Sequence, residues 1–230
     1  QSIYKYPKSW FDRFDVVYGD EAHNFKAKSL TSILDKCTDA AYRIGTTGTL
    51  DGAKTHKLVL EGIFGSVKKV ITTKKLMDDN AVASLDITCL VLEYSDVERK
   101  LVKGMTYQEE MDWIVSHPVR NTFLKNLCTT QTGNTLVLFQ YVEKHGRVLY
   151  DLINNKVGDT RSVFFVYGGT ATEQREEIRA LTETKDDAII VASYGTFSTG
   201  INIRNLHNIV FASPSKSRIR NLQSIGRGLR

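Results

Sequence analysis

Residues 163–192 read VFFVYGGTATEQREEIRALTETKDDAIIVA. Two short apolar runs in this stretch, Val163–Tyr167 and Ala188–Ala192, have the length and composition of buried β-strands. Between them, Thr172–Thr184 is polar and carries apolar side chains at helical spacing, which predicts an amphipathic α-helix. Strands joined through a crossover helix run parallel to each other. The stretch therefore predicts a parallel sheet.

The same alternation continues on both sides of this unit. Further strands are predicted at Asp15–Gly19, Tyr42–Gly45, Asp86–Tyr94, Thr135–Phe139 and Asn208–Ala212. Helices are predicted at Ser29–Cys37, Val97–Ser116, Val119–Thr130, Lys144–Asn154 and Lys216–Arg230. Short strands that alternate with longer helices indicate an α/β fold with helices on both faces of the sheet.

The composition is that of a globular protein. Of the 230 residues, 41% are hydrophobic and 25% are charged, and no apolar run has the length of a membrane span. This balance excludes a disordered tail, a collagen-like fibre and a small disulfide-stapled protein. The first residue is not Met and Arg230 lies within a predicted helix, so we expect a fragment of a longer protein.

The cysteine spacing and the charge distribution indicate which metal sites and binding partners to expect. Cys37, Cys89 and Cys128 are widely spaced, which predicts buried thiols in a reduced compartment and no zinc site. The net charge is +5, and residues 208–230 carry basic side chains but no acidic ones. Such a stretch is either a solvated basic helix or a surface that faces phosphates.

A polar and charged segment, Thr72–Ala83, divides the chain. About 75 residues precede it, too few for a complete nucleotide-binding α/β domain, and about 150 follow it, enough for one. We therefore expect two domains, residues 1–75 and residues 76–230, of which the first is incomplete.

Two adjacent carboxylates, Asp20 and Glu21, follow the first predicted strand directly. In open α/β sheets, ligands bind at the carboxyl ends of the strands. Asp20 can hold Mg²⁺ through water, because hard oxygen ligands suit this ion. Glu21 can orient and deprotonate a water that attacks a phosphate. Taken alone, such a pair is more often a loop or the N-cap of the next helix.

Asp20-Glu21-Ala22-His23 resembles motif II of the superfamily-two helicases of the DEAH type. Four further segments match this family in its own order: Gln1–Ile3 before motif II, Thr47–Thr49 as motif III, Ala192–Asn202 as motif V and Gln223–Arg230 as motif VI. The matches extend over nearly the whole chain. A closer likeness to a helicase of T-even bacteriophages is carried by Lys74–Met77, Thr106–Glu110 and Val191–Gly195.

The chain departs from the family pattern in two places. Gly200-Ile201-Asn202 stands where many relatives have Gly-x-Asp, and an amide cannot act as a carboxylate. The motif I phosphate loop is missing, since the chain has no Gly-Lys dipeptide, so the chain alone is expected to hydrolyse ATP negligibly. Gly48–Thr55 imitates such a loop, but Ala53 replaces its second glycine, and we interpret the segment as the motif III loop.

The resemblance implies two RecA-like α/β lobes with parallel sheets, the first incomplete, and ATP with Mg²⁺ in the cleft between the lobes. Glu21 would be the catalytic base and Asp20 the Mg²⁺ contact. Arg227 and Arg230, which share one helix face, would be arginine fingers, the alternative being a solvated helix end or a DNA-phosphate contact. The remaining residues of this site are nucleotide contacts at Gly200, Asn202 and Gln223 and coupling residues at His23, Thr47, Gly48 and Thr49.

The resemblance also implies DNA contacts at strand ends of the second lobe. Hydroxyl groups and main-chain N–H groups bind phosphates without reading bases. An ordinary strand-to-helix turn is the alternative interpretation for motif V. The implied contacts are Gln140, Gly168, Thr170, Ser193 and Thr199.

These expectations describe an ATP-dependent DNA helicase or translocase. It would hydrolyse ATP and act as a monomer on single-stranded or branched DNA in recombination, repair or replication restart. A phage-encoded protein of this kind would act in the host cytoplasm, without a membrane partner. Two alternatives remain: the motor subunit of a restriction enzyme, and a helicase-like nucleic-acid binding module without ATPase activity.

Overall fold

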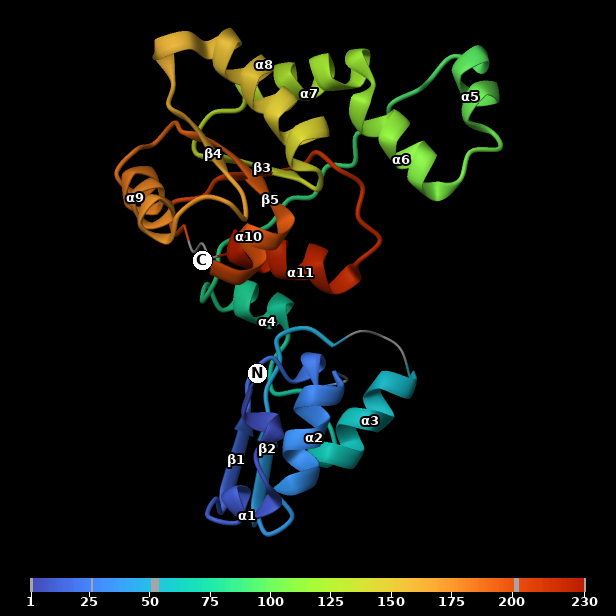
Figure 1. Ribbon diagram of the computed structural model, residues 1–230. Coiled ribbons are helices and arrows are strands. Elements are labelled where there is room, and N and C mark those ends of the chain that lie inside the picture. Colours follow the sequence, from blue (N-terminus) through green and yellow to red (C-terminus); the bar gives the residue numbers. More distant parts are fainter. Residues whose placement is uncertain (1, 26, 51–53, 201–202, 230) are drawn as a thin grey trace. The chain divides into compact units, whose positions relative to one another are not determined.

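The structure is a computed structural model that describes residues 2–25, 27–50, 54–200 and 203–229. The chain divides into two compact units, Gln1–Leu76 and Met77–Arg230, and each is described by itself (Figure 1). Among the described residues, no helix is long and apolar enough to cross a membrane.

The first unit contains a two-stranded parallel sheet. Its elements are η1 (Ser2–Lys5), α1 (Lys8–Phe11), β1 (Val16–Gly19), η2 (Ala22–Asn24), α2 (Lys28–Lys36), β2 (Tyr42–Gly45) and α3 (Lys54–Phe64), and α4 (Thr73–Asp78) follows at the division. Gly19 lies opposite Gly45 in the register, so β1 and β2 end at the same edge. A Cβ at Gly45 would lie 2.8 Å from the Phe64 ring, so glycine lets this ring pack closely against the strand end.

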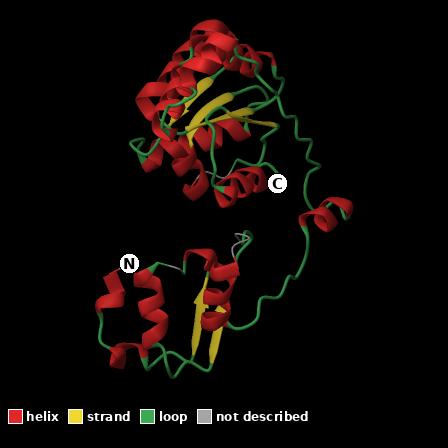
Figure 2. Ribbon diagram, turned by 90° about the vertical axis from the view of Figure 1, so that its right-hand side faces the viewer, coloured by secondary structure: helices red, strands yellow, loops and turns green. Residues whose placement is uncertain are grey.

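The second unit contains a four-stranded sheet in the order β4-β5-β3-β6, in which every neighbouring pair is parallel. Figure 2 shows helices on both faces of this sheet. The elements are α5 (Asp96–Val102), α6 (Tyr107–Ser116), α7 (Pro118–Thr130), β3 (Thr135–Phe139), the π-helix η3 (Val142–Arg147), α8 (Val148–Val157), η4 (Gly158–Thr160), β4 (Val163–Val166), α9 (Thr172–Glu183), β5 (Ile189–Ser193), α10 (Tyr194–Gly200), β6 (Asn208–Phe211) and α11 (Arg218–Arg227). The α/β class with parallel sheets is confirmed.

The core of the second unit follows the alternation of side chains along β3. Val137 and Phe139 face one side, where they pack with residues of α7 and α8. Leu136 and Leu138 face the other side, where they pack with residues of α9 and α10. The strand is buried on both faces, which explains why its sequence is a continuous apolar run.

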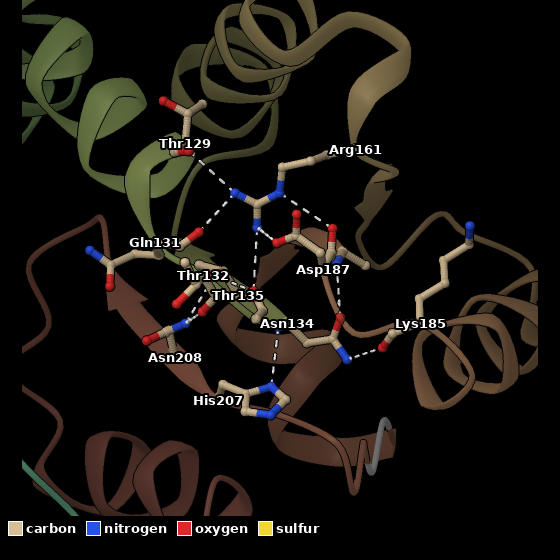
Figure 3. A network of polar contacts seen from close by, with 12 residues as sticks. Thr129, Gln131, Thr132, Asn134, Thr135, Arg161, Lys185, Asp187, His207 and Asn208 are labelled. Atoms are coloured by element: carbon tan, nitrogen blue, oxygen red, sulfur yellow. Dashed lines mark hydrogen bonds and ion pairs between the residues drawn. The ribbon is translucent and has the colours of Figure 1, made fainter.

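A polar network closes the sheet near the amino ends of its strands (Figure 3). The Asn134 side chain is fully buried, and its Nδ2 donates to the carbonyls of Thr182, Lys185 and Asn205 at 2.6–3.0 Å. Its Oδ1 accepts from the Ala188 N–H at 2.8 Å. One amide thus satisfies backbone groups from several connections that would otherwise be buried without partners.

Arg161 holds the neighbouring turns in the same way. Its guanidinium pairs with the Asp187 carboxylate at 2.7 Å. It also donates to the carbonyls of Gln131 at 2.9 Å and of Gly133 at 3.3 Å. A planar fork with several donors suits this bridging position, where a lysine ammonium would reach fewer acceptors.

We expect Asn134→Ala to destabilise the second unit by roughly 3 kcal/mol or more, because each buried backbone group left without a partner costs about 1–3 kcal/mol. Urea unfolding followed by circular dichroism measures this loss. Asn155→Ala, at an exposed position of α8, is the matched control and should change the free energy of unfolding little. Equal midpoints for the two variants would contradict the proposed role of the amide.

Three expectations about local structure are wrong. Asp86–Tyr94 forms no strand, and its residues Ile87 and Val91 are 69% and 84% exposed. An apolar run without a neighbouring strand gains no hydrogen bonds between strands. Cys89, expected to be buried, is exposed on this segment. The helix predicted over Val97–Ser116 is divided into α5 and α6, because each has its own capping box, Ser95 with Glu98 and Thr106 with Glu109.

Candidate functional site

In the first unit, the carboxylate pair lies at the ends of β1 and β2. Asp20 is exposed, and its Oδ1 accepts from the Glu21 N–H at 2.8 Å and from the Thr46 hydroxyl at 3.3 Å. Glu21 has φ 49° and ψ 49°, a left-handed conformation that is uncommon for a residue other than glycine. Such conformations concentrate at functional sites, because surrounding contacts must hold them. Nothing in the residue type predicts this conformation.

His23 connects this pair to the loop after β2. The histidine is 5% exposed, and its Nδ1 lies 2.9 Å from Thr47 Oγ1 and 3.3 Å from Glu21 Oε2. The Thr47 hydroxyl already donates to the Thr49 carbonyl at 2.8 Å, so its oxygen must accept from His23. His23 therefore carries a proton on Nδ1. The structure thus brings together the residues expected from motifs II and III, with Gly48 inside the same turn.

The atoms at this strand end that could bind a metal ion are oxygens: the carboxylates of Asp20 and Glu21 and the hydroxyl of Thr46. Mg²⁺ prefers oxygen ligands and keeps several waters, so an exposed Asp20 carboxylate fits a contact through water. The Glu21 side chain is 51% exposed and can reach a bound water. The residues present therefore fit the ion that the sequence predicts.

In the second unit, the polar loops lie at the carboxyl ends of the parallel strands. The chain passes from β3 to β4 on one side and returns through β5 to β6 on the other side of β3. The strand order therefore reverses between β3 and β6, and ligands of open α/β sheets bind outside such a reversal. Gln140 follows β3 and Ser213 follows β6, and the Gln140 N–H donates to Ser213 Oγ at 3.0 Å.

Several residues of this strand end were not predicted from the sequence. His145 on η3 is fully buried, and its Nδ1 lies 2.8 Å from Ser213 Oγ. Tyr194, the first residue of α10, donates its hydroxyl to the Ser213 carbonyl at 2.8 Å. Arg220 of α11 donates to Gln140 Oε1 at 2.8 Å. π-Helices occur frequently at functional sites, but no residue type in Val142–Arg147 predicts a π-helix there.

The other predicted DNA contacts take part in local hydrogen bonds. Thr170 is 7% exposed, and its Oγ1 accepts from the Tyr167 N–H at 3.0 Å, which closes the loop after β4. The Gly168 carbonyl accepts from Arg175 of α9 at 2.9 Å. The Ser193 hydroxyl lies 2.8 Å from Thr196 Oγ1 and accepts from the Thr196 N–H at 3.3 Å.

Helix α11 carries the basic residues expected to act on ATP. Arg220, Gln223 and Arg227 lie three and four residues apart, so they share one face. The Arg227 guanidinium carbon lies 5.8 Å from the centroid of the Phe197 ring. Arg230, Asn202 and Gln1 lie outside the described residues, as does the side chain of Thr199.

The buried His145 makes the stability of the second unit depend on pH. Burial, with a smaller contribution from the Arg120 charge, lowers the pKa of His145 from 6.5 to about 3. Below pH 6.5 the unfolded chain therefore binds a proton that the folded chain does not. The free energy of unfolding should fall as the pH is lowered from 6.5 toward about 3, by about 1.4 kcal/mol per pH unit at most.

Urea unfolding at several pH values between roughly 7 and 4 measures this effect. Because carboxylates also titrate in this range, His145→Gln is the comparison, since a neutral amide can keep a bond to Ser213. The slope should be shallower in the variant. Identical slopes in the two proteins would show that folding does not lower the pKa of His145.

Known helicases resemble this chain in sequence and in structure. The model of the helicase conserved C-terminal domain matches residues 119–230. The ATP-dependent DNA helicase uvsW of Enterobacteria phage T4 is 39% identical over the whole chain, which spans 46% of that protein. The crystal structure of T4 UvsW has 35% identity and a TM-score of 0.55, and the match covers 99% of this chain and 44% of that one.

A restriction-modification enzyme shares the fold. The ATP-dependent Type ISP enzyme LlaBIII, solved bound to DNA, has 16% identity and a TM-score of 0.64, and the match covers 98% of this chain and 17% of that one. Identity at this level shows a common fold alone, whereas the phage relative also shares the sequence. The likeness to a T-even phage helicase is confirmed, and residues 119–230 match the helicase conserved C-terminal domain.

Proposed function

We propose that this chain is part of an ATP-dependent DNA helicase or translocase that acts on branched or forked DNA. The observation that carries the proposal is the hydrogen-bonded group of Asp20, Glu21, His23 and Thr47 at the ends of two parallel strands. The relative that matches the whole chain is named an ATP-dependent DNA helicase. We call a protein that contains this chain together with a Gly-Lys-Ser/Thr phosphate loop the parent protein.

Glu21 acts as the general base in this proposal. Its exposed carboxylate accepts a hydrogen bond from the water that attacks the terminal phosphate, and it removes the proton. Asp20 would hold Mg²⁺ through water, and the ion would supply positive charge that offsets the charge on the phosphates. His23 transmits changes in the position of the site residues to the loop of Thr47, Gly48 and Thr49, because its Nδ1 is hydrogen-bonded to Thr47.

The second unit contributes both to ATP and to DNA. Arg227 and Arg230 stabilise the charge that develops on the transferred phosphoryl group, and Gln223, Gly200 and Asn202 contact the nucleotide. Gln140, Gly168, Thr170, Ser193 and Thr199 form the DNA contact, through amide, hydroxyl and main-chain groups that bind phosphates. The Thr170 hydroxyl accepts from the Tyr167 N–H and can still donate its own hydrogen to a phosphate, whereas the Thr170 N–H already donates to the Tyr167 carbonyl at 3.0 Å.

A strand-displacement assay tests this function. The parent protein should separate the strands of a fork with ATP, and it should leave a linear blunt duplex intact. Cleavage of either DNA would favour a restriction motor coupled to a nuclease, the second candidate, which the shared fold with the LlaBIII enzyme supports. DNA binding without any ATP-dependent change in the DNA would support a binding module and contradict the proposal.

A further inference from the structure

Arg220 and Gln140 form a hydrogen bond between α11 and the end of β3, across 80 positions of sequence. A guanidinium has only donors, so the Gln140 atom that faces Arg220 must be the amide oxygen. The bond thereby fixes which way the amide is turned. Gln140 Nε2 points away from Arg220, and because Gln140 is exposed, this donor can meet a phosphate oxygen.

The backbone of Gln140 is held firmly beneath its side chain. Its N–H donates to Ser213, whose hydroxyl contacts the buried His145 and whose carbonyl accepts from Tyr194. These bonds lie in a part of the sheet from which water is excluded, since His145 is fully buried and Tyr194 is 1% exposed. A ligand at the strand end can therefore displace the Gln140 side chain more easily than its backbone.

Arg220 also contacts α10, the helix that the Arg227 side chain contacts as well. The Arg220 guanidinium carbon lies 5.7 Å from the Tyr194 ring centroid, and that of Arg227 lies 5.8 Å from the Phe197 ring. Tyr194 and Phe197 are one turn apart on α10, beside which α11 lies (Figure 1). Ser224, which lies between the two arginines on α11, is fully buried, so this helix is packed along its length. Arg220 near the start of α11 and Arg227 at its end move together, because a helix of this length is rigid.

We propose that Arg220 is a positioning residue that links DNA contact to the arginine-finger helix. It turns the Gln140 amide so that Nε2 donates to a DNA phosphate, and it transmits the displacement of that amide to α11 and so to Arg227. The inference rests on the proposed DNA contact at Gln140. Arg220 differs in this from Arg218, an exposed arginine of the same helix that lies on another face.

Amide hydrogen exchange of the 230-residue chain, with and without saturating single-stranded oligodeoxynucleotide, tests this inference. In the unaltered chain, DNA should change the exchange rates of residues 218–227 about fivefold. This factor corresponds to the free energy of one net hydrogen bond. Arg220→Ala should abolish this change while the affinity for DNA stays within about threefold, and Arg220→Lys should restore part of it, since lysine keeps a donor. Arg218→Ala should retain the full change.

The outcomes separate the inference from the proposed function. If the unaltered chain binds no DNA, the proposed function and this inference both fail. If it binds DNA but α11 exchanges at the same rates, or if Arg220→Ala still responds, the function stands and the inference is overturned. A DNA affinity that falls in Arg220→Ala, with a salt slope shallower by about one, would make Arg220 a direct phosphate contact and also overturn it.

Discussion

Glu21→Gln should bind ATP nearly as well as the unaltered parent protein and hydrolyse it about 10²–10⁴-fold more slowly, the usual contribution of a general base. The amide keeps the size of the side chain but cannot take a proton. Glu21 is held in a left-handed backbone conformation next to Asp20, so its carboxylate is directed by the backbone rather than by a free loop. Steady-state turnover with DNA and equilibrium binding of an ATP analogue together measure the effect.

Glu61→Gln is the control for this substitution. Glu61 belongs to α3 of the same unit and pairs with Lys57 at 3.5 Å, so its loss removes a comparable carboxylate without touching the strand ends. The control should turn over at the parent rate. A Glu21→Gln protein that also turns over at the parent rate would show that another group is the base.

Arg227→Ala and Arg230→Ala should each lower the turnover rate of the parent protein by a factor on the order of 10³ or more. An arginine finger contributes mainly in the transition state, so the affinity for ATP should change less than the rate. Arg227 shares a face of α11 with Gln223, so the two side chains lie on the same side of the helix. Turnover at saturating DNA and the salt dependence of DNA binding are the two measurements.

A DNA-phosphate contact would behave differently. Its loss should leave turnover at saturating DNA unchanged and reduce the salt slope of DNA binding by about one. Arg218→Ala, at the exposed start of the same helix, should leave turnover at saturating DNA unchanged. If Arg227→Ala shows normal turnover and a shallower salt slope, Arg227 belongs to the DNA contact.

The central strands of the second unit, β3 and β5, were predictable because they are buried on both faces. Thr135–Phe139 is a continuous apolar run, and the structure pairs it with strands on either side. Asp86–Tyr94 has a similar composition but no partner strand, and composition alone does not reveal whether a partner exists. The division of α5 from α6 could have been found, since both capping boxes are visible in the sequence.

The candidate site was predictable where its residues belong to one short sequence motif. Asp20, Glu21 and His23 are adjacent in sequence, and the parallel register of β1 and β2 brings Thr47 beside them. Ser213, His145 and Arg220 are different, because they meet Gln140 only through the strand order, which no local pattern records. Ordinary residue types at remote positions give no signal until the fold is known.

DNA-dependent hydrolysis of ATP by the parent protein tests the proposed function most directly. The measurement is the turnover rate with and without forked DNA, for the unaltered protein and for Gln140→Ala. We predict a rate that rises strongly with DNA in the unaltered protein, and a half-maximal DNA concentration that is higher in Gln140→Ala. Turnover that is the same with and without DNA would contradict the claim that these strand ends belong to a DNA-driven motor.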